Sequence, residues 1–290
     1  IPDPEILQLI KDKSKQKEFY VKHNLPTAYY KVFNNSNEIK RDFELICYGR
    51  NSHELNDTNR IIGGEKLFVE DGANVLCSII NASEGPVYIG KNATIMEGSV
   101  IRGPAAICDN SVIKVGAKIY EGTTIGPYCK VGGEVYNSVF FGYSNKAHDG
   151  FFGHSVIGEW CNIGADTNTS NLKNDYSTIK LWDYAEGKFV DTGLQFCGLI
   201  MGDHSKSGIN VMFNSGTVVG MSSNIFGAGY PRHFVPSFSW GSPIGGFEDY
   251  LLQKAIKTAE LVCARRGIIF NEIDAEIFKY VYNLTYIYRY

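Results

Sequence analysis

Aliphatic side chains recur at every sixth position through the middle of the chain. A small or medium-sized side chain follows each of them by four positions. The eight consecutive aliphatic positions are Ile89, Ile95, Ile101, Ile107, Ile113, Ile119, Ile125 and Val131. An amphipathic helix repeats about every 3.6 residues and an ordinary strand alternates, so neither explains this period. The pattern predicts a mainly β protein built on a left-handed parallel β-helix, in which aliphatic side chains of stacked coils fill the tube.

Two segments interrupt the repeat, near residues 133–150 and 167–198. Between them the repeat is shifted by two residues, and we expect it to resume at Phe151 and Ile157. A second regular run begins at Met201. Insertions in a solenoid form surface loops that often carry function. Both segments are therefore expected to be loops, and the functional site should lie at one of them.

The two ends of the chain lack the six-residue period. Residues 4–20 are expected to form a helix, and a further helix is expected over residues 247–266 with Gly267 as its stop. Asn271 can cap a second C-terminal helix, with Asp274 at its third position. This tail should cover an open end of the solenoid or a neighbouring subunit, because an uncovered sheet edge invites aggregation.

These patterns divide the chain into three parts. They are an N-terminal helix and mixed connecting segment, the β-helix with its two insertions, and a C-terminal helical tail. The corresponding ranges are residues 1–65, 66–242 and 243–290.

Charge and cysteine content exclude several classes of protein. The net charge of −3, from 28 basic and 31 acidic residues, gives no reason to expect a nucleic-acid partner. The seven cysteines are odd in number and never form a C-x-x-C pair, which argues against a disulfide framework and a zinc cluster. We find no signal peptide and no apolar run of transmembrane length. We therefore expect a cytoplasmic protein without a membrane partner.

Chemically useful side chains gather at the first interruption. His148 lies beside Asp149, with Lys146 just upstream, and its imidazole could serve as a general base near neutral pH. A surface histidine in a polar loop is an equally good interpretation from composition alone. His154 follows six residues later and could stack on the next coil. Zinc usually needs three protein ligands, and only His204 could be the third, so we expect no metal.

The segment from Lys146 to Asn171 carries a family resemblance. Its motif I-G-x-x-C-N-I-G-A-x-T is followed by an asparagine six residues after the alanine. The segment resembles the acetyltransferase half of the bifunctional N-acetylglucosamine-1-phosphate uridylyltransferase/glucosamine-1-phosphate acetyltransferase. Residues 27–245 look even more like a bacterial family of sugar-1-phosphate nucleotidyltransferases, which join a nucleotidyltransferase-like N-terminal region to a left-handed β-helix.

The resemblance implies a role for several residues. It makes His148 the catalytic base, which takes a proton from a sugar amine as the amine attacks the thioester of acetyl-CoA or another acyl-CoA. Backbone amides of the coil would stabilise the oxyanion. The other implied residues are the substrate-binding candidates Lys146, Asn162, Asn171 and Lys180 and the cofactor-binding candidates Ala165 and Gly208.

Several positions depart from the family pattern. Phe151 replaces a tyrosine near the sugar phosphate, and Ile209 replaces a serine after Gly208. A lysine expected soon after Asn171 falls near Ser177, and only Lys173 or Lys180 could take its place. Asn162 and Asn171 could instead form an asparagine ladder at the β-helix corners.

The nucleotidyltransferase signature is also missing, because no G-x-G-T-R-type loop occurs before residue 60. Nucleotidyltransferase activity would then require residues upstream of this chain. The leading hypothesis is an acyl-CoA-dependent acyltransferase for an amino sugar or sugar phosphate, part of a nucleotide-sugar biosynthetic protein, working as a homotrimer. The alternative is a noncatalytic β-helix that trimerises or regulates a sugar-1-phosphate nucleotidyltransferase.

Overall fold

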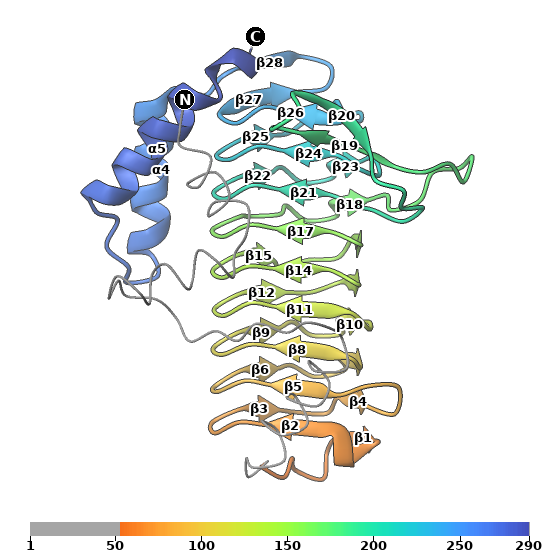
Figure 1. The fold of residues 1–290 in the computed structure, drawn as a ribbon. Coiled ribbons are helices and arrows are strands. Elements are labelled where there is room, and N and C mark those ends of the chain that lie inside the picture. Colours follow the sequence, from red (N-terminus) through yellow and green to blue (C-terminus); the bar gives the residue numbers. More distant parts are fainter. Residues whose placement is uncertain (1–52, 290) are drawn as a thin grey trace, which may run out of the picture. The chain divides into compact units, whose positions relative to one another are not determined.

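A computed structural model describes residues 53–289 of the chain. The helix expected over residues 4–20 lies outside the described residues. Residues 60–242 form a parallel β-helix whose coils are stacked one above another (Figure 1). The predicted left-handed β-helix fold, with two helices after it, is confirmed.

Three stacks of short parallel strands form the sides of the tube. The first contains β1 (Arg60–Ile62), β4 (Ile79–Asn81), β7 (Val100–Arg102), β10 (Lys118–Ile119), β13 (Glu134–Tyr136) and β16 (Phe151–Gly153), followed by β18 (Asn168–Thr169) and β23 (Met212–Phe213). The second contains β2 (Leu67–Val69), β5 (Val87–Ile89), β8 (Ala105–Ile107), β11 (Thr123–Ile125), β14 (Val139–Phe140), β17 (Val156–Ile157), β21 (Ile200–Met201), β24 (Val218–Val219) and β26 (Phe234–Val235). The third contains β3 (Asn74–Val75), β6 (Thr94–Ile95), β9 (Val112–Ile113), β12 (Lys130–Val131), β15 (Asn145–Lys146), β22 (Lys206–Ser207), β25 (Asn224–Ile225) and β27 (Ser239–Ser242).

The predicted aliphatic positions are the inward positions of these strands. Ile89 pairs with Ile107, which pairs with Ile125, so that side chains of one kind stack through successive coils. All eight residues from Ile89 to Val131 are buried. Burial of this continuous apolar column is the main favourable term for a solenoid, because each coil can hide its inner face only against its neighbours.

The segment 133–150 is not a loop, contrary to the sequence-based expectation. It forms β13, β14 and β15, which pair in register with the coils below. The period breaks because the turns shorten: Ile101 pairs with a residue eighteen positions later, whereas Ile119 pairs with Val135, sixteen positions later. For the same reason the inward residue of β16 is Phe152 rather than Phe151.

The chain leaves the solenoid only after β18. There β19 (Lys180–Asp183) and β20 (Lys188–Asp191) form an antiparallel hairpin that projects from the upper coils (Figure 1). Trp182 of this hairpin stacks on Phe234, with ring centroids 4.2 Å apart. The solenoid also begins earlier than the expected boundary at residue 66, because β1 already pairs in parallel with β4. A short 3-10 helix, η1 (Gly64–Lys66), joins β1 to β2.

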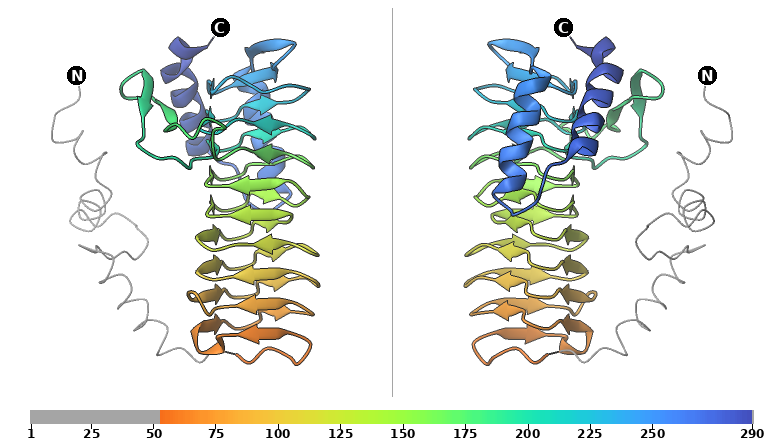
Figure 2. Two further views of the ribbon diagram at one scale, coloured as in Figure 1. Left: turned by 90° about the vertical axis from the view of Figure 1, so that its right-hand side faces the viewer. Right: turned by 90° about the vertical axis from the view of Figure 1, so that its left-hand side faces the viewer.

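Two antiparallel helices, α4 (Leu252–Ala264) and α5 (Glu272–Leu284), lie along the side of the upper coils (Figure 2). α4 starts later than expected because Phe247 belongs to β28 (Gly246–Asp249), which pairs antiparallel with β27. Asn271 caps α5 as predicted, and Asp274 completes a capping box. Among the described residues, no helix is long and apolar enough to span a membrane.

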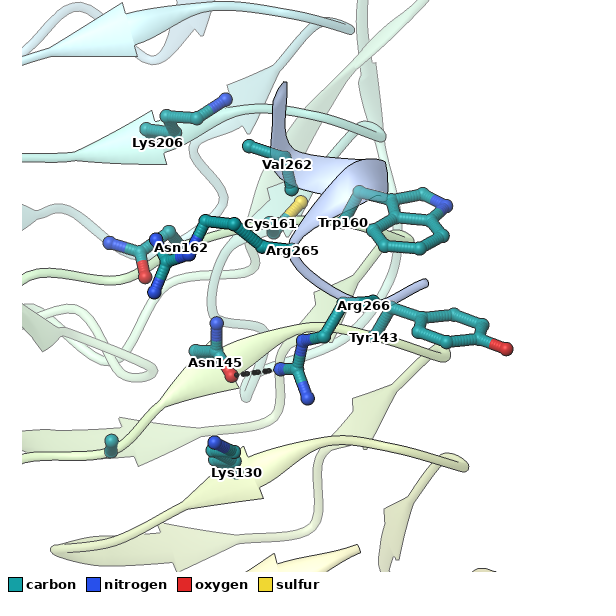
Figure 3. Close-up of a pocket in the computed structure, with 11 residues that line it drawn as sticks. Lys130, Tyr143, Asn145, Trp160, Cys161, Asn162, Lys206, Val262, Arg265 and Arg266 are labelled. Carbon is teal, nitrogen blue, oxygen red and sulfur yellow. Dashed lines mark hydrogen bonds between the residues drawn. The ribbon is translucent and has the colours of Figure 1, made fainter. Parts of the chain in front are cut away.

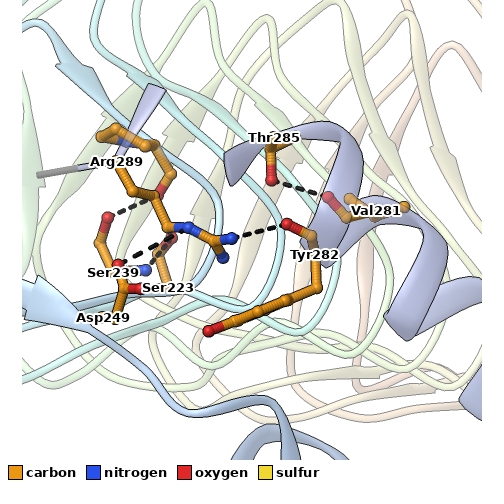
Figure 4. Close-up of polar contacts among 8 residues, drawn as sticks. Ser223, Ser239, Asp249, Val281, Tyr282, Thr285 and Arg289 are labelled. Atoms are coloured by element: carbon orange, nitrogen blue, oxygen red, sulfur yellow. Dashed lines mark hydrogen bonds and ion pairs between the residues drawn. The ribbon is translucent and has the colours of Figure 1, made fainter. Parts of the chain in front are cut away.

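The C-terminal segment is fastened to the last coils by Arg289, beyond the 3-10 helix η2 (Tyr286–Tyr288). Its side chain is 1% exposed. The guanidinium donates to the carbonyl oxygen of Tyr282 at 2.6 Å and lies over that residue's ring (Figure 4). Its Nε lies 3.6 Å from a carboxylate oxygen of Asp249. The arginine therefore connects α5 to β28.

Candidate functional site

His148 lies at the corner between β15 and β16. Its side chain is exposed and borders a surface cavity of about 360 Å³. The same cavity is lined by Ala165 on the next coil and by Asp149 and Asp166. The structure thus brings together the expected base and one of the two expected cofactor-binding residues.

A buried lysine supports the corner that carries His148. The side chain of Lys146 points into the tube at the level where the coil below places Val131, and it is 1% exposed. Its Nζ donates to the carbonyl oxygens of His148 at 2.7 Å and Gly132 at 3.1 Å. Burial lowers the pKa of Lys146 to about 8. The expectation that Lys146 binds substrate does not fit this position, because its ammonium group is enclosed by the backbone.

The corner is also held by Gly150, two residues after His148. Gly150 has φ +120°, and a Cβ at this position would collide with the carbonyl oxygen of Thr167 on the next coil. Only glycine accepts this combination of dihedral angle and close approach. The backbone around His148 is therefore tightly constrained, by Lys146 from inside the tube and by Thr167 on the coil above.

Asn162 lies in a second cavity, of about 550 Å³, between the third side of the solenoid and the end of α4 (Figure 3). It bridges Asn145 on the coil below and Lys206 on the coil above through parallel backbone pairing. Ala147 lines both this cavity and that of His148. The two cavities are therefore neighbours on one coil, with the base on one side of Ala147 and Asn162 on the other.

Asn171 and Lys180 lie away from His148. The amide nitrogen of Asn171 is 2.9 Å from Nδ1 of His154, which follows β16 at a different corner of the coil. The imidazole of His154 also stacks on Phe196, and burial lowers its pKa. Lys180 begins the projecting hairpin and is exposed. Within one chain, neither residue joins the cavity of His148.

Gly208 and Ile209 lie one coil above the cofactor candidate Ala165. Gly208 packs against Gly164, where a Cβ on Gly164 would collide with the carbonyl oxygen of Gly208. The backbone N–H of Asn210 donates to the carbonyl oxygen of Ala165 at 2.8 Å. Ile209 is 69% exposed and lies one coil above Ala165, outside the cavity of His148.

His204, the third histidine considered as a zinc ligand, makes aromatic contacts as His154 does. His204 stacks on Trp160 with ring centroids 6.1 Å apart and meets Phe278 edge-on. Within residues 53–289, no three or more His, Cys, Asp or Glu side chains are placed to hold a metal ion.

Two arginines that the sequence did not single out complete the cavity of Asn162. Arg265 and Arg266 follow the last residue of α4, and Nη2 of Arg266 donates to Oδ1 of Asn145 at 3.0 Å (Figure 3). The adjacent Arg-Arg pair before the predicted stop at Gly267 is the feature of the sequence that could have pointed to them. Whether the two arginines reach the solenoid depends on where the helix packs, which no local pattern reveals.

Curated proteins match the chain in sequence, whereas no protein-family model does. The bifunctional protein GlmU of Methanocaldococcus jannaschii is 38% identical over 87 residues, covering 30% of this chain and 21% of that protein. A bifunctional sugar-1-phosphate nucleotidylyltransferase/acetyltransferase of Sulfurisphaera tokodaii is 29% identical over 145 residues, covering 49% and 36%. The uncharacterized acetyltransferase YaiX of Escherichia coli O6:K15:H31 is 31% identical over 149 residues, covering 51% and 64%.

These relatives match the β-helix part of the chain. The predicted resemblance is confirmed. Archaeal as well as bacterial proteins are among the relatives, and the chain spans only 21%, 36% and 64% of the three named above. Among solved structures, the UDP-N-acetylglucosamine acyltransferase of Francisella novicida is 14% identical, with a TM-score of 0.37 over 79% of this chain and 76% of that chain. The polySia-specific acetyltransferase NeuO is 12% identical, with a TM-score of 0.36 over 72% and 94%.

Proposed function

We propose that this chain is an acyl-CoA-dependent acyltransferase that acts on an amino sugar or a sugar phosphate. The observation that carries the proposal is the exposed imidazole of His148 beside Ala165, at a rigid corner of a β-helix related to acetyltransferases. The noncatalytic alternative gives no reason for a buried lysine and a strained glycine to hold an exposed histidine in place.

In the proposed reaction His148 acts as the general base. The acceptor nitrogen attacks the thioester carbonyl, a carbon–nitrogen bond forms, and the carbon–sulfur bond of the acyl-CoA breaks. The proton lost by the amine passes to the imidazole and then to the departing CoA thiolate. Acetyl-CoA is the proposed donor, because the matched relatives are named acetyltransferases.

We further propose that the active form is a homotrimer working in the cytoplasm. Within one chain the cavity of His148 is open, and two of the residues assigned to substrate by resemblance, Asn171 and Lys180, lie elsewhere. A neighbouring solenoid packed against the His148 corner would close the cavity and could supply such side chains. A trimer would thus explain why Asn171 and Lys180 lie away from His148 within one chain.

Binding and turnover of the purified 290-residue chain test the proposal. Titration calorimetry with acetyl-CoA should show binding, and thiol release should depend on an amino sugar or amino sugar phosphate. We expect His148→Ala to lower turnover by about two orders of magnitude or more, the usual contribution of a general base. His233→Ala, which removes an exposed histidine on another coil, is the matched control.

Lack of acetyl-CoA binding at millimolar concentration would exclude the acyltransferase and favour the noncatalytic β-helix. Unchanged turnover in His148→Ala would remove this residue from the role of base while leaving the donor assignment intact.

A further inference from the structure

The cavity of Asn162 is unusual for its charge. We call it the arginine groove and define it by Lys130, Asn145, Asn162, Arg265 and Arg266. None of the described residues that line it is acidic, although the whole chain has a net charge of −3. Asp149 and Asp166 line the cavity of His148 on the other side of Ala147 instead. A pocket with several cations and no carboxylate among its described residues has a positive potential that favours an anion.

The cations come from two separate elements and face the same space. Lys130 is an exposed residue of β12, whereas the arginines follow α4, more than a hundred residues later. In Figure 3 the side chains of Arg265 and Arg266 extend from the end of α4 toward the strands of the solenoid, and Arg266 is joined to Asn145 by its hydrogen bond. Lys206 also borders the groove, but its Nζ donates to the carbonyl oxygen of His204. One of the three donors of Lys206 is therefore already used inside the protein.

Several of these donors are not used inside the protein. Among the described residues, the side chains of Arg265 and Lys130 have no hydrogen-bond or ion-pair partner. Arg266 gives one of its donors to Asn145. Cations at the end of a helix offset the helix dipole, and Arg266 also anchors α4 to the solenoid, so these two roles explain the arginines in part. They do not explain Lys130, which belongs to a strand.

We infer that the arginine groove binds a phosphoryl group. Guanidinium groups bind phosphate oxygens through paired N–H donors, and the asparagine amides can add neutral donors. A volume of about 550 Å³ has room for a phosphate or pyrophosphate together with part of the molecule that carries it. Because Ala147 lines both cavities, a ligand whose phosphoryl end lies in the groove can extend toward His148.

This inference deepens the proposed function, and only the identity of the ligand rests on that function. The phosphoryl group could belong to a sugar phosphate, to the diphosphate of a nucleotide sugar, or to the acyl-CoA. All three share the same chemistry, so binding measurements must separate them.

Titration calorimetry with the full chain provides the test. The probes are inorganic pyrophosphate, a hexosamine 1-phosphate, a nucleoside diphosphate and coenzyme A, each at low and high salt. Arg265→Gln is the main variant because its side chain has no described partner and its loss should not loosen α4. Arg265→Gln combined with Lys130→Gln removes both free cations, and Lys91→Gln removes one exposed charge on a distant coil as the control.

We expect pyrophosphate and at least one organic probe to bind. Their affinity should fall about tenfold in Arg265→Gln, fall further in the double variant, and stay unchanged in Lys91→Gln. The organic probe that loses affinity identifies the source of the phosphoryl group. The inference is overturned if no probe binds the wild type at millimolar concentration, or if the double variant binds every probe as the wild type does.

The outcomes also separate this inference from the proposed function. His148→Ala should retain pyrophosphate binding, because the histidine lies in the other cavity. Arginine-dependent binding without any acyl transfer would support the groove and exclude the acyltransferase. Acyl transfer that is unchanged in the Arg265 and Lys130 variants would support the acyltransferase and exclude a role of the arginine groove in it.

Discussion

The ammonium group of Lys146 and the carbonyl oxygen of His148 are 2.7 Å apart, joined by a hydrogen bond inside the β-helix. On the two coils below, the equivalent inward positions hold Val131 and Ile113. Enclosing a charged amine where an aliphatic side chain would fit costs stability, because burial removes its hydration. The lysine is thus better explained by its hold on the His148 corner than by core packing.

The buried amine should make stability depend on pH. Burial lowers the pKa of Lys146 to about 8, whereas an unfolded lysine titrates near 10.5. Between these values the unfolded chain binds the extra proton, so the folded state gains stability as the pH rises from about 8 to 10.5. Compared with Lys146→Met, the wild type should gain roughly 3 kcal/mol over this range. Urea unfolding of both proteins at several pH values measures the difference, and parallel curves would contradict it.

Lys146→Met should also affect catalysis through His148. Without the ammonium group, the carbonyl oxygens of His148 and Gly132 lose their described side-chain donor, and the corner can shift. A shift of the base should lower kcat about tenfold or more while leaving the KM for acyl-CoA nearly unchanged. Steady-state kinetics separate the two parameters. An equal change in both would indicate general loosening of the coil instead of a positioning role.

Gly150 offers a second way to move the same corner. Gly150→Ala introduces a Cβ that collides with the carbonyl oxygen of Thr167, at a φ of +120°. We expect a loss of about 3 kcal/mol or more in the free energy of unfolding. Gly116→Ala is the matched control, because Gly116 also has positive φ but a Cβ there has no neighbour within 4 Å. Strain alone should cost this control about 1 kcal/mol. Equal losses in thermal or urea unfolding would contradict the close approach at Gly150.

Acid should weaken the upper coils through His204. This side chain is 8% exposed and its Nδ1 has no hydrogen-bond partner. Burial, with a smaller effect of the Lys206 charge, lowers the pKa of His204 to about 3. Because the unfolded imidazole takes up its proton near pH 6.5, stability is lost as the pH falls from about 6.5 toward 3. At pH 5 the wild type should lose about 2 kcal/mol that His204→Phe does not lose. Identical acid profiles of the two proteins would rule out this assignment.

The sequence predicted the β-helix correctly where the six-residue repeat is regular and failed where the turns between strands shorten. The stack from Ile89 to Val131 was predictable because every coil needs a large apolar side chain at the same place. The segment 133–150 was mistaken for a loop because a shortened turn breaks the period as an insertion does. Lys146 added to the error, since a charged residue at an inward position conceals the strand.

The candidate site was only partly predictable, because some of its residues are close in sequence and others are far apart. His148 and Ala165 lie on consecutive coils, so a motif in one stretch of sequence captured both. The arginine groove combines β12 and β15 with the end of α4, and no local pattern shows where that helix packs. Asn171 was assigned to substrate by resemblance, and whether a neighbouring subunit brings it to a site stays a prediction.

Arg289 provides a test of how the C-terminal helices are attached. Replacing it by methionine keeps an apolar stem but removes the hydrogen bond to Tyr282 and the charge facing Asp249. Asp249 is 34% exposed, which weakens the ion pair, so we expect Arg289→Met to cost about 2 kcal/mol rather than the 3–5 kcal/mol of a fully buried pair. Arg289→Met combined with Asp249→Asn should cost less than the sum of the single changes. Thermal unfolding of the four proteins measures this coupling, and strict additivity would show that the arginine acts through its contacts with Tyr282 and not through Asp249.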